Sequence, residues 1–209
     1  MKRIESETYF RRKVAREAAL LLYTLEEKEF KRAKERAAKM LGLKIFPSNF
    51  EVAEELDRIA DEFEGEERWS RLIQMRREAL EIMELLSAFH PRLIGSVWRG
   101  TANKNSDIDI VVFSYDEKLV IEVIKKGGLK VLGVERAPSE KNGRGETFHI
   151  FVEFSSGDKT EIIVRRPEDI DKIEICDIYG DVKRGLTIDQ LKDVLERDPL
   201  RRFIPRRRR

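Results

Sequence analysis

Apolar residues in the first ninety positions recur every three or four residues, which is the spacing of one face of an α-helix. This pattern predicts a first helix over residues 5–41, whose apolar face bends or shifts near Glu26, where a step of five interrupts the spacing. Gly42 follows, and glycine commonly ends a helix because it tolerates a left-handed backbone. The chain is therefore expected to begin with a long amphipathic helix.

Two more helices are expected before residue 91. Ser48 precedes Glu51 by three residues, the spacing of a capping box, so a second helix is predicted over residues 48–65. A third is predicted over residues 66–89, again with its apolar side chains on one face. The chain thus begins with a predicted three-helix region.

Beyond residue 91 the pattern changes to short apolar runs separated by turns. It predicts strands over 93–94, 107–113, 129–134 and 173–178, a hairpin over 148–164, helices over 117–126 and 187–195, and a substrate-covering loop over 136–146. Thr187 is expected to cap the last helix. Strands and helices in this order predict an α+β fold, a mixed β-sheet with helices on one face.

Two short segments of this region carry the candidate chemistry. In Asp107-Ile108-Asp109 the two carboxylates project from one face of an extended strand. They repel each other, and a hard divalent cation is a common way to keep both ionised. Upstream, Gly95 permits a tight turn and Ser96 is expected to cap the next helical turn, whose backbone amides would bind an anion. The sequence predicts a phosphate site beside a metal site.

This combination resembles the signature of the DNA polymerase beta-like nucleotidyltransferase superfamily. The string GSVWRGTANKNSDIDIVVF, residues 95–113, is similar to the archaeal CCA-adding enzymes and, more loosely, to 2′-5′-oligoadenylate synthetases. The similarity is specific over these residues and extends as a compatible pattern over 91–164. The alternative is an ordinary strand with two surface aspartates beside an unrelated turn.

The resemblance implies a third carboxylate on a later strand. In the CCA-adding enzymes it follows a hairpin turn, and the matching residue is Glu161, where the family usually has aspartate. Glutamate is one methylene longer, so a metal ion would shift or be held less rigidly. Glu153 is the alternative third carboxylate, and either residue could instead be solvated on the polar face of the hairpin.

The implied reaction is metal-dependent transfer of a nucleoside monophosphate from a nucleoside triphosphate (NTP) to a hydroxyl group, with release of pyrophosphate. Two Mg²⁺ ions, or Mn²⁺ in their place, would be held by Asp107, Asp109 and Glu161. The implied nucleotide-binding residues are Gly95, Ser96, Arg99 and Lys104. Arg99 is alternatively a structural ion-pair partner.

Composition bounds this interpretation. The 209 residues include one cysteine, Cys176, and two histidines, so neither an internal disulfide nor a zinc cluster is expected. A charged N-terminus and the lack of an apolar stretch of about 20 residues predict no signal peptide, no membrane span and a cytoplasmic protein. Charged residues make up 39% and glutamine occurs twice, which hints at a thermophilic source. The predicted division is a helical region over 1–90, a catalytic core over 91–178 and a helix with a basic tail over 179–209.

Charge is unevenly distributed along the chain. Residues 1–46 hold 13 lysines and arginines against 7 acidic residues, and residues 179–209 hold 10 against 5, whereas residues 47–90 hold 5 against 12. Basic ends are expected to attract RNA, the favoured acceptor, although they could serve solubility alone. A protein or toxin partner is the alternative acceptor, and an inactive nucleotide- or RNA-binding module is the alternative to an enzyme. The oligomeric state stays open.

Overall fold

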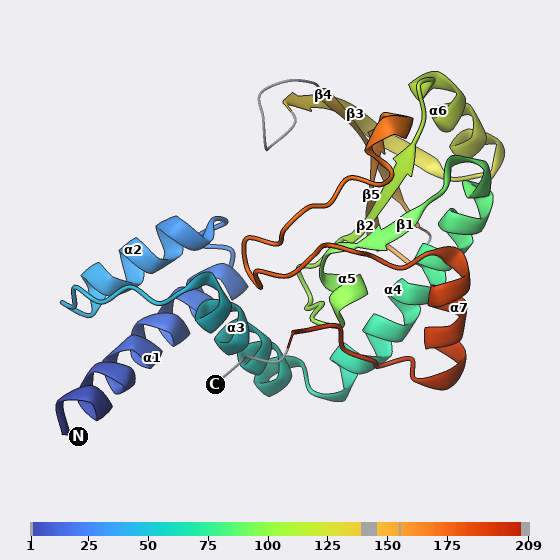
Figure 1. Ribbon diagram of the computed structural model, residues 1–209. Coiled ribbons are helices and arrows are strands. Elements are labelled where there is room, and N and C mark those ends of the chain that lie inside the picture. Colours follow the sequence, from blue (N-terminus) through green and yellow to red (C-terminus); the bar gives the residue numbers. More distant parts are fainter. Residues whose placement is uncertain (1, 139–145, 155, 206–209) are drawn as a thin grey trace. The chain divides into compact units, whose positions relative to one another are not determined.

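The computed structural model describes residues 2–138, 146–154 and 156–205 (Figure 1). The helices are α1 (Lys2–Tyr23), α2 (Phe30–Met40), α3 (Asn49–Glu64), α4 (Glu66–Leu85), α5 (Gly95–Arg99), α6 (Glu117–Lys126) and α7 (Ile188–Arg197). The strands are β1 (Arg92–Ile94), β2 (Ile108–Phe113), β3 (Lys130–Pro138), β4 (Glu146–Glu153) and β5 (Lys159–Arg165). Two compact units result: Met1–Arg68 with Asn103–Asn105 and Ile175–Asp181, and Trp69–Ala102 with Ser106–Glu174 and Val182–Arg209.

The first unit is a helical layer of α1, α2 and α3 with a core of its own. Small side chains dominate this core, among them Ala15, Ala18, Ala19, Ala33 and Ala37, all of which are buried. Alanine keeps the helices close to one another, and each helix turns charged residues to water. Arg12 of α1 donates to the carboxylate of Glu55 of α3 at 2.9 Å, so charge also links the two helices.

The single helix predicted over residues 5–41 is wrong, because the chain forms two helices there. Leu25 has a φ of 60°, a left-handed conformation that an α-helix cannot contain. The amide of Glu27 reaches back to the carbonyl of Leu21 at 3.1 Å and closes the end of α1. The step of five near Glu26 is the sequence signal of this break: a continuous helix would rotate the second apolar run away from the core.

The predicted start of α3 is confirmed. The Ser48 hydroxyl accepts from the amide of Glu51, and the Glu51 side chain accepts from the amide of Ser48, which completes a capping box. Gly65, with a φ of 56°, separates α3 from α4. Arg68 is buried and donates to the carboxylates of Asp57 and Asp61, so the end of α3 is tied to the start of α4.

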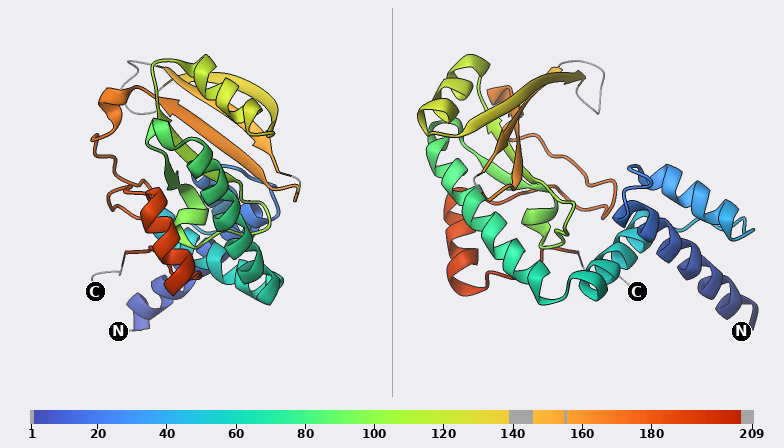
Figure 2. Two further views of the ribbon diagram at one scale, coloured as in Figure 1. Left: turned by 90° about the vertical axis from the view of Figure 1, so that its right-hand side faces the viewer. Right: turned by 180° about the vertical axis from the view of Figure 1, so that it is seen from behind.

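The second unit contains a five-stranded sheet in the order β1-β2-β5-β4-β3. Strands β2 and β5 are parallel, and the other neighbouring pairs are antiparallel. The sheet is mixed, and Figure 2 shows α4 and α6 on the same side of it in both views. The α+β fold and the hairpin β4–β5 expected from the sequence are therefore confirmed.

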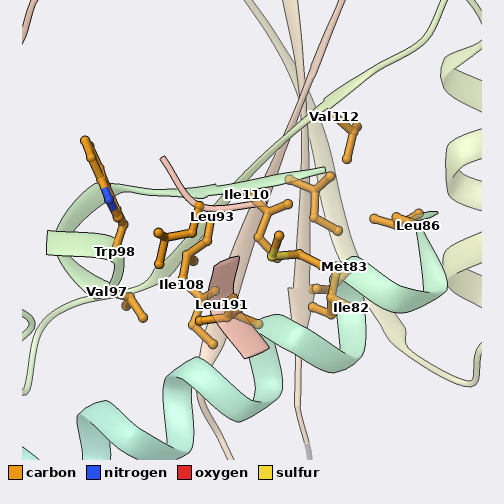
Figure 3. Close-up of a cluster of buried hydrophobic side chains, with 14 of the residues drawn as sticks. Ile82, Met83, Leu86, Leu93, Val97, Trp98, Ile108, Ile110, Val112 and Leu191 are labelled. Carbon is orange, nitrogen blue, oxygen red and sulfur yellow. The ribbon is translucent and has the colours of Figure 1, made fainter. Parts of the chain in front are cut away.

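Side-chain alternation gives the sheet a buried apolar face. Ile108, Ile110 and Val112 of β2 belong to one buried apolar cluster with residues of α4, and Ile150 of β4 and Ile162 of β5 belong to the same cluster. Figure 3 shows side chains of β1 and β2 gathered against Ile82, Met83 and Leu86 of α4 and Leu191 of α7. Because neighbouring residues on a strand point to opposite faces, this core directs Asp109 and Glu161 to the other face.

Several details after β3 differ from the prediction. Strand β3 continues to Pro138, and residues 139–145 of the predicted loop lie outside the described part of the chain. The edge strand predicted over 173–178 is wrong: the amide of Cys176 donates to Asp181 and that of Gly180 to Cys176, which closes a turn. The last helix is confirmed, with Thr187 in a capping box. Within the described residues, none of the helices has both the length and the apolarity to cross a membrane.

Candidate active site

The candidate site is built around Asp109, near the middle of the sheet. Asp109 lies opposite Ile94 of β1 on one side and opposite Glu161 of β5 on the other. Asp109 and Glu161 are thus direct neighbours on paired parallel strands and share a face. Asp107 precedes β2 and is exposed to solvent. Strand pairing therefore fixes the positions of Asp109 and Glu161, and the third predicted carboxylate, Asp107, lies directly before the first residue of β2.

Gly95 follows β1 and meets the carboxylate of Asp109. Its φ is 69°, which side chains rarely adopt, and a Cβ atom at this position would lie 1.9 Å from Oδ2 of Asp109. Only glycine fits this close approach. The predicted turn and the predicted acidic strand therefore meet at van der Waals contact.

Ser96 is the second residue of α5, so the prediction that it caps this helix is wrong. Ile94 occupies the N-cap position, and no side chain of the described residues caps α5. The reason is that strand β1 runs directly into the helix. The N-cap position therefore falls on its last residue, Ile94, whose apolar side chain cannot accept a hydrogen bond from the first amides. The first amides of α5 are thus without the side-chain acceptor that a cap would provide, beside a half-buried serine.

Electrostatics sets Asp109 and Asp107 apart from ordinary surface acids. Burial, with the nearby charges of Glu161 and Asp107, raises the pKa of Asp109 to about 7. Partial desolvation raises the pKa of Asp107 as well, although this side chain reaches solvent, and the charge of Lys159 opposes the shift. A bound cation would stabilise the ionised forms of these two aspartates, because the negative charges of neighbouring carboxylates repel one another.

The donor set fits a hard divalent cation in its chemistry. All three side chains offer carboxylate oxygens, the ligands that Mg²⁺ and Mn²⁺ prefer. In the described residues, however, no three His, Cys, Asp or Glu side chains are arranged as a closed coordination group. Glu161 instead accepts from His149, with 2.6 Å between Oε1 and Nδ1.

Glu153, the alternative third carboxylate, lies farther out in the sheet. It belongs to β4, which β5 separates from β2, and its register partner on β5 is Lys159. Its carboxylate is 3.9 Å from the ammonium group of Lys130 on β3. Of the two glutamates, Glu161 is therefore the direct neighbour of Asp109.

Arg99, at the end of α5, is buried by the C-terminal segment. Only 4% of the residue is exposed, its guanidinium donates to the carbonyl of Phe203 at 2.9 Å, and it stacks over the Trp98 ring at 4.3 Å. The amide of Phe203 donates back to the Arg99 carbonyl. These contacts are structural, although neither is the ion pair that the sequence analysis gave as the alternative role of Arg99.

A buried arginine holds the same segment against α5. Arg76 of α4 is fully buried and donates to the carbonyls of Val97, Trp98, Pro199 and Arg201 at 2.7–3.1 Å. Burial lowers its pKa to about 10. Residues 199–203 thus pack against α5, the helix that begins at Gly95. This structural role could not be inferred from the basic composition of the segment.

Lys104 belongs to the first unit. Its ammonium group lies 4.5 Å from the centre of the Tyr23 ring, and its amide donates to the carboxylate of Glu64 at 3.1 Å. A cation over an aromatic face is held by the ring quadrupole. No contact of Lys104 points to a nucleotide, and that role stays a prediction.

Sequence reasoning missed two residues of the site. Arg71 of α4 donates to Asp158 at 2.8 Å and to the carbonyl of Ser106 at 3.4 Å, and so anchors the residue before Asp107. His149 contacts Glu161, as described above. Alternation along β4 places His149 on the polar face of the strand. The roles of His149 and Arg71 could not be predicted, however, because their partners Glu161 and Asp158 are distant in sequence.

A family model described as a nucleotidyltransferase domain matches residues 77–206, more than half of the chain. The chain belongs to this family. It is a transferase of the EC 2.7.7 type and a member of the polymerase beta-like nucleotidyltransferase superfamily, as the motif string predicted. No curated protein and no solved structure matches it.

In this nucleotidyltransferase, a cavity of about 440 Å³ lies at the opposite end of β2 from Asp109. Its walls include Ser114 and the guanidinium groups of Arg136 and Arg165. Arg136 pairs with Glu117, and Arg165 pairs with Glu174. Two of the positive charges in the cavity wall are therefore already paired with carboxylates of the chain.

Proposed function

We propose that this nucleotidyltransferase moves a nucleoside monophosphate from an NTP to a hydroxyl group of RNA and releases pyrophosphate. The observation that carries the proposal is the close approach of Gly95, at the start of α5, to Asp109, which pairs with Glu161 on the adjacent strand. This pairs a turn suited to phosphate with carboxylates suited to a cation. The family supports nucleotidyl transfer in general, and we assign the individual roles to the residues named below.

The proposed metal ligands are Asp107, Asp109 and Glu161, with Mg²⁺ as the expected ion and Mn²⁺ as a substitute. Bound divalent cations supply Lewis-acid stabilisation of the phosphates and lower the pKa of an attacking hydroxyl group. The protein's own part is to gather three carboxylates whose repulsion favours such ions. Asp109, whose pKa is raised to about 7 chiefly by burial, is expected to matter most, since burial weakens screening by water.

The proposed phosphate-binding residues are Gly95 and Ser96. The amides at the start of α5 have no side-chain cap, and the Ser96 hydroxyl is at hand to donate to a phosphate oxygen. Arg99 and Lys104 stay predictions without a supporting contact, because they face Phe203 and Tyr23. We therefore expect phosphate binding to depend chiefly on backbone donors.

RNA is the proposed acceptor because of charge. Helix α2 exposes Lys31, Arg32 and Lys39, and the chain ends in four arginines. Such cationic segments bind phosphate backbones by releasing counterions. Neither base contacts nor a sequence preference are part of this proposal.

The test is a labelling assay with the full chain. Each of four α-labelled NTPs is incubated with Mg²⁺ and total RNA, and the label in RNA and in protein is separated on gels. Wild type should label RNA, and Asp109→Asn should lose at least 100-fold in rate, the order expected when a transition-state electrostatic contact is removed. Asp171→Asn, an exposed aspartate of the same unit, is the matched control and should keep full activity.

Each other outcome points to a different function. Label in a protein but not in RNA would replace RNA by a protein acceptor and keep the chemistry. Equal labelling by wild type and Asp109→Asn would overturn the catalytic assignment. Binding of NTP or RNA without any labelling would favour the inactive binding module.

A further inference from the structure

His149 lies beside the third carboxylate, on the face of the sheet that carries Asp109. Glu161 is opposite Phe151 in the register of β4 and β5, so His149 is its diagonal neighbour. The imidazole Nδ1 is 2.6 Å from Oε1 of Glu161, and the two side chains are 17% and 28% exposed. Diagonal neighbours on paired strands are within reach of long side chains, which explains how the sheet itself creates this contact.

Hydrogen-bond chemistry assigns the direction of this contact. An ionised carboxylate only accepts, so Nδ1 carries the hydrogen and His149 donates to Glu161. The other ring nitrogen, Nε2, is 2.7 Å from the hydroxyl of Thr147, which lies 3.3 Å from the carbonyl of Ala137 on β3. Fixing one ring nitrogen orients the other. The contact of Nε2 with Thr147 thus orients the imidazole so that its Nδ1–H points to Glu161.

The hydrogen bond from His149 compensates for the greater flexibility of a glutamate at position 161, where the family usually has an aspartate. Glutamate has one more rotatable bond than aspartate, and a longer ligand places its oxygens less reproducibly. His149 restrains Oε1, while Oε2 makes no hydrogen bond to the described residues. Carboxylates that bind metals are commonly restrained in this way by a neighbour that does not touch the metal.

We propose that His149 is a positioning residue: it holds Glu161 by Oε1 so that Oε2 is the third ligand of the divalent cation. The inference rests on the proposed function, because it takes Glu161 as a metal ligand. It adds a residue that the sequence motif lacks, and a two-step support that runs from Thr147 through His149 to Glu161.

The test is Mn²⁺ binding to the full chain, measured by electron paramagnetic resonance of free Mn²⁺ at fixed pH. His149→Ala should weaken binding 10- to 100-fold, the usual effect of losing such a support. His149→Gln keeps an N–H donor and should recover most of the affinity, and Thr147→Val should lose a few-fold. His90→Asn is the control, because His90 is exposed and asparagine tolerates its left-handed φ of 50°.

A double-mutant cycle separates positioning from a general structural effect. With Glu161→Gln in place, His149→Ala should cause no further loss of Mn²⁺ affinity, because the ligand it orients is gone. Unchanged or tighter Mn²⁺ binding by His149→Ala would overturn the inference, as it would mean that His149 competes with the ion for Glu161. If Asp109→Asn also binds like wild type, the proposed metal site fails as a whole. If only Asp109→Asn is impaired, the metal site stands and the role of His149 alone is lost.

Discussion

A methyl group on Gly95 would lie 1.9 Å from Oδ2 of Asp109, so a turn and a strand separated by twelve residues touch with no room between them. The separation between two heavy atoms in van der Waals contact is about 3.5–4.0 Å. Any side chain at residue 95 must therefore displace the carboxylate that we assign to the metal.

This contact predicts that Gly95→Ala inactivates the enzyme. The added Cβ atom pushes Asp109 away, and alanine is strained at a φ of 69°. We expect nucleotidyl transfer to fall at least 100-fold and the free energy of unfolding to fall by about 1–3 kcal/mol. Activity and urea unfolding measure the two effects.

Gly128→Ala is the matched control for Gly95→Ala. Its φ is 81°, but no atom lies within 4 Å of the added Cβ. It should lose about 1 kcal/mol of stability from the left-handed backbone and keep full activity. Equal activity of the two variants would show that contact with Asp109 is not what residue 95 contributes.

The raised pKa of Asp109 predicts a stability that depends on pH. Its pKa moves from 3.8 to about 7 on folding, so between these values the folded protein holds a proton that the unfolded chain has lost. The contribution of Asp109 to the free energy of unfolding therefore falls as pH rises from about 4 to about 7. At 1.36 kcal/mol per unit the whole effect is at most about 4 kcal/mol.

Urea unfolding in EDTA at pH 5 and pH 7.5 measures this effect. Other carboxylates titrate in the same range, so the quantity of interest is the difference between wild type and Asp109→Asn. The variant should lack this loss of stability with rising pH. At pH 7.5, Mg²⁺ should stabilise wild type and not the variant. Parallel pH profiles of the two proteins would contradict the assignment.

Arg76 predicts a large loss of stability when its charge is removed. Arg76→Met removes the donor of four carbonyl groups, two of them buried and two partly buried, and releases Pro199 and Arg201 from α4. Breaking a buried charged network of this kind costs about 3–5 kcal/mol. Arg77→Met, on the exposed side of α4, should change stability by less than about 0.5 kcal/mol in the same urea experiment. A small effect at residue 76 would mean that water replaces the guanidinium.

The C-terminal tail predicts a salt-dependent affinity for RNA. Removing residues 206–209 deletes four arginines and leaves the contacts of residues 199–203 in place. The slope of log affinity against log salt should decrease by up to about 3 for single-stranded RNA. Fluorescence anisotropy with an oligonucleotide measures it, and the melting temperature should not change. Unchanged affinity at low salt would count against a role of the tail.

A longer deletion, to residue 198, tests a different property of the same segment. It removes the partners of Arg76 and Arg99, and we expect loss of stability together with loss of activity. The predicted basic tail is thus two parts: a structural segment up to about residue 203, and the arginines that follow Pro205.

The amino-acid sequence by itself determined most of the secondary-structure elements and the reaction class. Capping residues such as Ser48 and Thr187, the alternation in β2, and the spacing of Gly95 and Asp109 are local, and local rules assign them. The tertiary structure alone decided which distant residues meet. The contacts of His149 with Glu161, Arg71 with Asp158 and Arg76 with residues 199–201 depend on strand register and helix packing. A shift of one residue in the register of β4 and β5 would turn His149 and Glu161 to opposite faces, and the partners of Arg71 and Arg76 depend on how α4 packs in the fold.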